Sequence, residues 1–197
     1  MNKVKLAIVY YSAYGTNHAM AEVAEQAAKA LGAEVRLRKV QETAPQAVID
    51  TVAPWKEFQQ KTAGVAVATP DDLVWANAML FSAPTRFGTV ASQMRAFIDT
   101  LGPIWQQGHL NHKAVSMMTS AQNLHGGQET TTTGMYTTFA HWGSIIVPPG
   151  FTDGVMFKGL GNPYGASNNM GPIDEEVKDI IGYQTKRLVE VAGKLAA

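Results

Sequence analysis

A loop of hydroxyl, amide and glycine residues follows the first apolar run of the chain. It reads Ser12-Ala13-Tyr14-Gly15-Thr16-Asn17 and leads into a segment whose apolar residues recur at helical spacing. The unbonded N–H groups at the start of a helix, with hydroxyl donors beside them, are suited to hold a phosphate group. The loop therefore predicts a phosphate site, and the alternative is a helix N-cap formed by Thr16 or Asn17.

The same loop limits the kind of phosphate that it can bind. It contains no Lys or Arg, and the chain has no G-x-x-x-x-G-K-[ST] motif. A triphosphate with magnesium usually requires the lysine of that motif, whereas a phosphate monoester can be held by N–H and hydroxyl donors alone. The loop thus favours FMN over ATP.

Two later loops carry side chains that suit the rest of such a ligand. Pro84-Thr85-Arg86-Phe87-Gly88 follows the apolar run 78–82, and its arginine and phenylalanine can flank an aromatic ring and bond its polar edge. A solvated arginine over a packed phenylalanine is the alternative. Residues 119–128 follow the run 114–118 and are polar and long enough to wrap around a ligand.

The segments that must position these loops alternate between strand and helix patterns. Apolar or alternating runs predict strands at 4–11, 34–39, 78–82, 114–118 and 144–147, with 34–39 at an edge of the sheet. Helical spacing predicts helices at 20–31, 90–101, 129–141 and 177–195, the second of them closed by Gly102-Pro103. The remaining long stretches, 41–70 and 149–172, are predicted to be irregular connections.

This order of elements predicts an α/β fold with a doubly wound five-stranded parallel sheet and helices on both faces. No repeat or shift in composition divides the chain, so we expect a single domain over residues 1–197. Sheets of this kind bind ligands outside the carboxyl ends of their strands. Because each polar loop follows a predicted strand, we expect the three loops to form one site.

The composition excludes several classes of protein. Sixteen basic and sixteen acidic residues give a formal net charge of zero, so no positive field attracts nucleic acid or an anionic membrane surface. The chain has no cysteine, which excludes disulfides, thiolate catalysis and cysteine-ligated metals. No apolar run is long enough to cross a bilayer and no signal-peptide pattern is found, so we expect a soluble cytoplasmic protein. His109 and His112 have no nearby carboxylate, and no metal site is expected.

Four blocks of the chain resemble the WrbA family of NAD(P)H:quinone oxidoreductases. They are Tyr10-Tyr11-Ser12-Ala13-Tyr14-Gly15, Ala83-Pro84-Thr85-Arg86-Phe87-Gly88, His125-Gly126-Gly127-Gln128-Glu129 and Ala140-His141-Trp142-Gly143. Asn162-Pro163-Tyr164-Gly165-Ala166 is similar to a late loop of that family. The resemblance runs in order from about residue 4 to the last predicted helix. It implies bound FMN, a flavodoxin-like fold with an insertion, and a homotetramer.

The resemblance also implies roles for individual residues. Ser12, Tyr14, Gly15, Thr16 and Asn17 match the family's phosphate and ribityl loop, and Thr85, Arg86, Phe87 and Gly88 match its isoalloxazine loop. The third flavin loop corresponds to Ser120, Ala121, Gln122, Asn123, Leu124, His125 and Gly126. His141 matches a histidine near the flavin, Tyr14 a residue implicated in nicotinamide binding, and Trp105 a residue lining the acceptor pocket.

Some of these positions allow other interpretations. The family commonly has S-T-G where this chain has Ser120-Ala121-Gln122, so a hydroxyl and the backbone freedom of a glycine are lost. Without the resemblance, Trp105 is read as a core tryptophan. His141 is read in the same way as a histidine that stabilises a helix dipole.

The activity that the resemblance implies is hydride transfer from NAD(P)H to FMN, followed by two-electron reduction of a quinone in a ping-pong cycle. The flavin carries out this chemistry, so no side chain is expected to be an obligatory nucleophile or acid–base group. One alternative is a single-electron carrier of the flavodoxin type, although such carriers are strongly acidic and this chain is neutral. The other alternative is a regulatory flavoprotein without catalysis.

Overall fold

The computed structural model describes residues 3–159 and 161–196. The strands are β1 Lys5–Tyr10, β2 Glu34–Lys39, β3 Ala78–Arg86, β4 Thr89–Val90, β5 Ala114–Ala121, β6 Ile145–Ile146 and β7 Ser167–Asn169. The helices are α1 Thr16–Ala30, α2 Gln46–Ile49, α3 Ala53–Lys61, α4 Pro70–Trp75, α5 Ser92–Asp99, α6 Gly102–Gln106, α7 Gln128–His141 and α8 Glu175–Leu195, with a 3₁₀ turn η1 at Gly154–Phe157.

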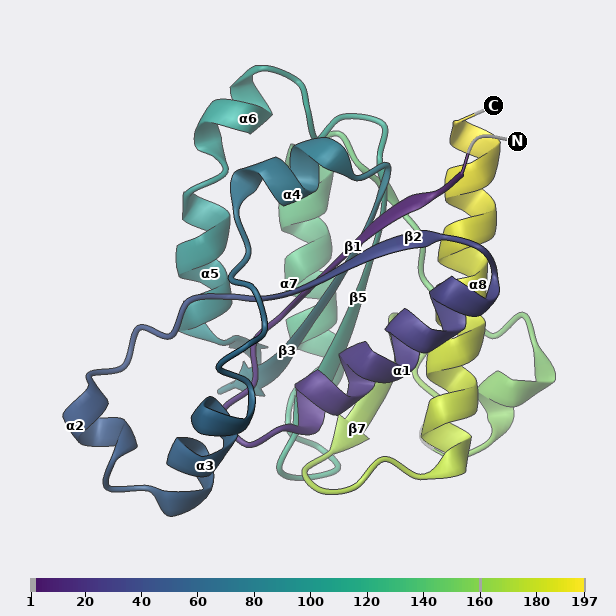
Figure 1. The fold of residues 1–197 in the computed structure, drawn as a ribbon. Coiled ribbons are helices and arrows are strands. Elements are labelled where there is room, and N and C mark those ends of the chain that lie inside the picture. Colours follow the sequence, from purple (N-terminus) through teal and green to yellow (C-terminus); the bar gives the residue numbers. More distant parts are fainter. Residues whose placement is uncertain (1–2, 160, 197) are drawn as a thin grey trace.

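The sheet has the predicted parallel, doubly wound arrangement. Its main path runs β2-β1-β3-β5-β6, with all neighbours parallel and β2 at the edge. Two short strands extend it, because β4 forms an antiparallel hairpin with β3 and β7 pairs parallel with β5. Helices α1 and α8 cover one face of the sheet and α5 and α7 the other (Figure 1). The five-stranded prediction is therefore confirmed for the main path.

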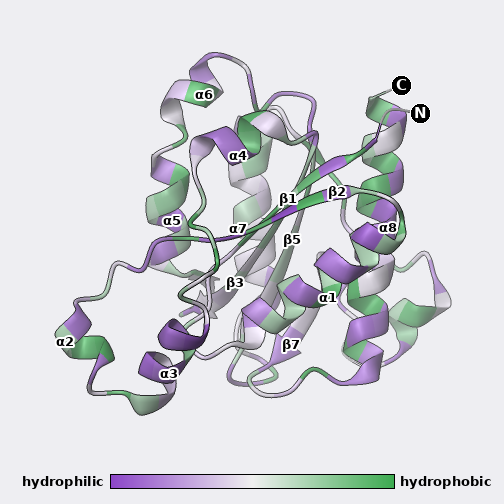
Figure 2. Ribbon diagram, in the orientation of Figure 1, coloured by the Kyte–Doolittle hydropathy of each residue, from purple (hydrophilic) through white to green (hydrophobic). Residues whose placement is uncertain are grey.

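Side chains of the central strands alternate between two cores. In β1, Leu6 and Ile8 pack in the cluster under α1 and α8, whereas Ala7 and Val9 pack in the cluster under α5 and α7. Along α8, hydrophobic and hydrophilic residues alternate (Figure 2), as expected for a helix with one buried face. Among the described residues, no helix is both long and apolar enough to cross a lipid bilayer.

Strands β3 and β5 are longer than predicted. Their pairing continues past residues 82 and 118 through Ala83 opposite Thr119 and Pro84 opposite Ser120. The Thr119 hydroxyl donates to the carbonyl of Ala83 at 2.8 Å, which ties the two strand ends together. The first residues of the second and third loops therefore lie on rigid strands.

Three other predictions of secondary structure were wrong. Gly102-Pro103 begins α6 instead of closing the preceding helix, because a proline in the first turn breaks no helical hydrogen bond. The stretch 41–70 contains α2 and α3, and the stretch 149–172 contains η1 and β7. These elements are too short for a periodic pattern to reveal them.

Candidate functional site

The three polar loops meet at the carboxyl ends of β1, β3 and β5 and line one cleft of about 490 Å³. The lining residues are Ser12, Ala13, Tyr14, Thr16, Asn17, Pro84, Thr85, Arg86, Phe87, Ser120, Ala121, Gln122, Asn123, Gly126 and Met170. All of these except Met170 belong to the loops predicted from the sequence. Met170 follows β7, and its N–H donates to the carbonyl of Ala121 at 2.7 Å. No pattern in the stretch 149–172 signals this contact.

The first loop has the geometry of a phosphate cradle. Gly15 precedes α1 with a φ of 103°, and its N–H donates to the Ser12 hydroxyl at 2.9 Å. No side chain caps α1, so the alternative interpretation of Thr16 or Asn17 as an N-cap does not apply. The first N–H groups of an uncapped helix lack intrahelical partners. They are therefore left for an anion at the mouth of the cleft.

Asn17 has a structural role in this cradle. Its side chain is buried and donates from Nδ2 to the Ser82 hydroxyl at 3.1 Å, while its Oδ1 accepts from the Ser120 hydroxyl at 2.6 Å. The amide thus joins the start of α1 to β3 and β5. Thr16 is half-buried and lines the same cleft, with no side-chain partner among the described residues.

The second loop is a tight hairpin that exposes an aromatic ring. Phe87 and Gly88 connect β3 to β4, and both have positive φ, 53° and 79°, as in a type I′ turn. Phe87 is fully exposed, with a relative accessibility of 106%, so the alternative of a packed phenylalanine is contradicted. Arg86 is also exposed, and its Nη1 donates to the carbonyl of Thr85 at 3.0 Å. The hairpin therefore holds a ring and a guanidinium at the rim of the cleft.

The third loop is organised by Gln128, which the sequence did not single out as a site residue. Its Oε1 accepts from the N–H of Gly126 at 3.0 Å, and its Nε2 donates to the carbonyl of Asn123 at 2.9 Å. A Cβ on Gly126 would lie 2.5 Å from the Cβ of Ala121. The loop is thus folded tightly against the end of β5.

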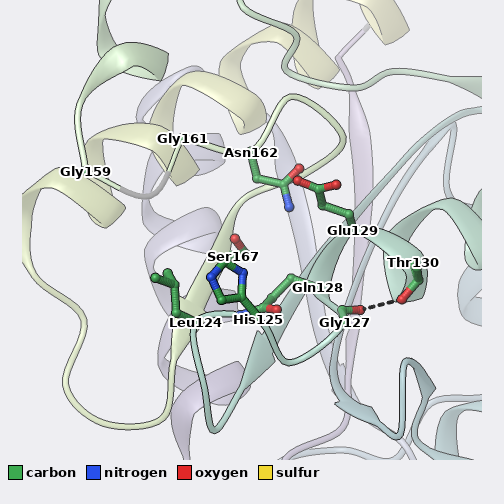
Figure 3. A pocket seen from close by; sticks show the side chains of 10 residues that line it. All are labelled: Leu124, His125, Gly127, Gln128, Glu129, Thr130, Gly159, Gly161, Asn162 and Ser167. Carbon is green, nitrogen blue, oxygen red and sulfur yellow. Dashed lines mark hydrogen bonds between the residues drawn. The ribbon is translucent and has the colours of Figure 1, made fainter.

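Two predicted residues face away from the cleft. Leu124 and His125 line a separate hollow of about 530 Å³, together with the first turn of α7, Asn162 and Ser167 (Figure 3). The third loop accordingly separates two cavities. Of the other predicted residues, Gly15 and Gly88 shape the turns of the first and second loops.

Trp105 and His141 are not brought to the cleft within one chain. Trp105 lies in α6, at the end of the sheet opposite to β7 and the start of α1 (Figure 1). Its Nε1 donates to the carbonyl of His141 at 3.0 Å, and both side chains are exposed. Trp105 is therefore not a core tryptophan, and the two residues form an exposed pair on the far side of the molecule.

His18 is a buried titratable group next to the first loop. Its ring packs 4.9 Å from Tyr10 and 5.6 Å from Phe58, measured between ring centroids, and its Nδ1 has no partner among the described residues. Burial lowers the pKa of His18 below its usual 6.5, although Glu22 opposes this effect. The folded protein therefore keeps this imidazole neutral at neutral pH.

We expect this histidine to make the protein sensitive to acid. The unfolded chain takes up a proton as the pH falls through about 6.5, whereas the folded chain does so only at lower pH, so the free energy of unfolding decreases over that window. Urea unfolding at several values between about pH 8 and about pH 5 measures this slope. In His18→Gln, which cannot be charged, the slope should be shallower; an unchanged slope would assign acid sensitivity to other groups.

Comparisons with known proteins agree with this geometry. Residues 5–154 match the family model described as NADPH-dependent FMN reductase. A Deinococcus radiodurans protein named NAD(P)H dehydrogenase (quinone) is 56% identical over 194 residues, covering 98% of this chain and 97% of that protein. A Geotalea uraniireducens protein of the same name is 39% identical over 203 residues, covering 98% and 100%.

Solved structures show the same fold at low sequence identity. A flavodoxin, WrbA-like protein from Agrobacterium tumefaciens superposes with a TM-score of 0.69 at 16% identity, covering 98% of this chain and 99% of that one. Flavodoxin 2 from Bacillus cereus has a TM-score of 0.65 at 16% identity, covering 94% and 98%. The fold is therefore flavodoxin-like, and the chain belongs to the NADPH-dependent FMN reductase family.

Proposed function

We propose that this protein is a cytoplasmic, FMN-dependent NAD(P)H:quinone oxidoreductase. The observation that carries the proposal is the single cleft built from three loops at the strand ends, which combines an uncapped helix start with an exposed ring and guanidinium. Membership of a flavin-using family and full-length relatives named NAD(P)H dehydrogenase (quinone) support it. FMN, when bound, supplies the redox chemistry.

The residues of the cleft fit the parts of FMN. The start of α1 and the Thr16 hydroxyl suit a phosphate monoester, and the absence of Lys and Arg from this loop disfavours a triphosphate. Arg86, Phe87 and the tight turn at Gly126 suit the edge and face of a flat ring. No side chain of the cleft is needed as a nucleophile, so these residues bind and orient the cofactor.

The reaction is a two-electron ping-pong cycle in this proposal. The exposed ring of Phe87 and the half-exposed ring of Tyr14 flank the cleft mouth, which suits a narrow slot for one flat ligand at a time. NAD(P)⁺ must then leave before the quinone enters. Steady-state rates with NADH or NADPH at several fixed benzoquinone concentrations should give parallel double-reciprocal lines, and intersecting lines would contradict the shared slot.

Replacement of Phe87 by asparagine should stabilise the protein while impairing turnover. Asn is favoured at this position of a type I′ turn, so the free energy of unfolding should rise by about 0.5–1 kcal/mol. Loss of the ring should lower kcat/KM for NAD(P)H and quinone about tenfold. The matched control is His112→Asn, since His112 has a φ of 61° outside the cleft: it should raise stability without changing turnover. Equal turnover in both variants would leave Phe87 without a functional role.

A flavodoxin-type carrier is the second candidate function. The similarity in fold to flavodoxins favours it, while the zero net charge gives no field for docking a charged protein partner. A carrier would stabilise the one-electron-reduced flavin as a persistent radical, and a regulatory flavoprotein would show no NAD(P)H oxidation. Radical signal during reductive titration therefore separates the carrier from the other two candidates, and NAD(P)H oxidation separates the enzyme from a regulatory flavoprotein.

The enzyme is a homotetramer in this proposal. The exposed Trp105–His141 pair cannot reach the cleft of its own chain, whereas the resemblance to WrbA proteins implies His141 near the flavin and Trp105 in the acceptor pocket. A second copy that places this pair over the cleft would satisfy both observations. Light scattering of the FMN-loaded protein should report a mass well above the 21.2 kDa of one chain, and a strict monomer would contradict this arrangement.

A further inference from the structure

The nicotinamide co-substrate needs a space outside the cleft but in contact with it. FMN fills the 490 Å³ cleft in the proposed function, so the larger part of a dinucleotide must lie in an adjoining cavity. Two large hollows lie beside the cleft, one of about 530 Å³ beyond the third loop and one of about 700 Å³ between α3, α5 and the hairpin of β3 and β4. We call the second the α5 hollow.

The 530 Å³ hollow is poorly suited to this ligand. It shares no lining residue with the cleft, because the third loop stands between them. Figure 3 shows the Glu129 carboxylate directed into it beside Asn162. A carboxylate without a cation among the lining residues would repel the diphosphate of a dinucleotide.

The α5 hollow has the opposite properties. It shares Ala13, Tyr14, Arg86 and Phe87 with the cleft, so a ligand can contact both. Its remaining lining residues are Tyr11, Trp55, Thr89, Val90, Ser92, Gln93 and Arg95. Two guanidiniums and four aromatic side chains border it, and no carboxylate is among the lining residues. This combination suits a ligand with both flat rings and negative charge.

The wall of the α5 hollow is fixed by one carboxylate behind it. Glu42 accepts from the Tyr11 hydroxyl at 3.0 Å, from Trp55 Nε1 at 3.2 Å and from Gln93 Nε2 at 2.9 Å, all three being lining residues. It also accepts from Gln59 Nε2 at 3.2 Å and from two backbone N–H groups. Burial, with Glu42 close by, raises the pKa of Tyr11, so its hydroxyl remains a donor. The side chains around the hollow are thus held in place before a ligand arrives.

Of the two arginines that line the α5 hollow, Arg95 is the one that the proposed flavin site does not use. It is exposed on α5, and its Nη1 donates to the Thr138 hydroxyl at 2.9 Å. Among the described residues it has no acidic partner. Its charge is therefore oriented by Thr138 but not neutralised.

We propose that the α5 hollow binds the diphosphate-bearing part of the nicotinamide co-substrate, with Arg95 as its charge partner. This inference rests on the proposed function, because it extends the same flavin site. Glu42 acts as a positioning residue that holds Trp55 and Gln93 in the wall. The ring of Trp55 lies edge-on to Tyr14, with centroids 6.3 Å apart, which continues the aromatic border from the cleft into the hollow.

The test uses the FMN-loaded full-length protein and Arg95→Ala. The KM for NADH or NADPH should rise about 10- to 30-fold, as expected for the loss of a charge-assisted hydrogen bond, with kcat and the KM for benzoquinone unchanged. Reduced N-benzylnicotinamide has the reacting ring but no phosphate, so its oxidation should be the same in both proteins. Arg95→Lys should recover part of the loss. Lys186→Ala removes an equal charge from an exposed site on α8 and should change nothing.

Calorimetric titration with ADP separates this inference from the proposed function. ADP should bind the wild type and bind Arg95→Ala at least about tenfold more weakly, whether or not NAD(P)H is oxidised. Glu42→Gln should also weaken ADP binding, since its amide donors would face Trp55 or Gln93, whereas Glu57→Gln on exposed α3 should not. Failure of the wild type to oxidise NAD(P)H would refute the proposed function alone. Equal ADP affinity and equal KM in wild type and Arg95→Ala would overturn the inference and leave the proposed function intact.

Discussion

Alanine at position 127 is expected to weaken FMN binding by about 30- to 1000-fold. Gly127 has a φ of 89°, and a Cβ there would lie 2.7 Å from the Cα of Gly88 in the second loop. The Thr130 hydroxyl bonds the carbonyls of both Gly88 and Gly127 at 3.0 Å. The added methyl group must therefore separate the second and third loops directly beside Phe87 and Gly126, which line the cleft. Titration of the apoprotein, followed by flavin fluorescence, measures the loss.

The matched control is Gly134 in α7, the helix that Gly127 precedes as its N-cap residue. A Cβ on Gly134 in α7 would meet nothing within 4 Å, so Gly134→Ala should raise the free energy of unfolding by about 0.5–1 kcal/mol and leave FMN affinity unchanged. Wild-type FMN affinity in Gly127→Ala would show that the contact between the two loops is not needed for the cofactor.

Asn17→Ala and Thr16→Ala, made separately, should weaken different properties. The first should lower the stability of the fold and the second the affinity for FMN. Asn17→Ala removes the two side-chain bonds that join α1 to Ser82 and Ser120 in the interior, and we expect a decrease of about 2–4 kcal/mol in the free energy of unfolding of the apoprotein. Thr16→Ala touches no interior partner, so stability should hardly change while FMN affinity falls about 5- to 30-fold.

Urea unfolding of the apoprotein and FMN titration, carried out on both variants, distinguish these losses. Thr16→Ala serves as the control for Asn17→Ala, because both residues lie in the first turn of α1. The interpretation fails if Asn17→Ala unfolds like the wild type, or if Thr16→Ala lowers stability as much as Asn17→Ala does.

The sequence predicts the central fold because burial of strands leaves a strong periodic pattern. The run that becomes β1 is apolar on both faces, and 34–39 alternates, which predicts a buried strand and an edge strand. The ends of β3 and β5 were missed because Pro84 and the polar residues after Met118 resemble a loop. Their strand conformation depends on pairing between chain segments more than 30 residues apart.

The positions of the three site loops could be predicted, but the direction of individual side chains could not. Asn17 and Thr16 are adjacent polar residues, and only the serines of two distant strands determine that the first is buried. Glu42 is one acidic residue in an irregular stretch, and its donors come from three other parts of the chain. Such contacts leave no local spacing in the sequence. Trp105 and His141 show the same limit, because the resemblance implies places for them in the site, whereas the structure puts both at the other end of the sheet.

Anaerobic mixing of the purified, FMN-loaded protein first with NAD(P)H and then with benzoquinone tests the central claim most directly. We expect the flavin absorbance to bleach with an equimolar amount of NAD(P)H and to return in full with an equimolar amount of quinone, without a persistent radical signal. A protein that takes up no FMN, or a bound flavin that NAD(P)H fails to bleach, would contradict the claim that this cleft is the site of an NAD(P)H:quinone oxidoreductase.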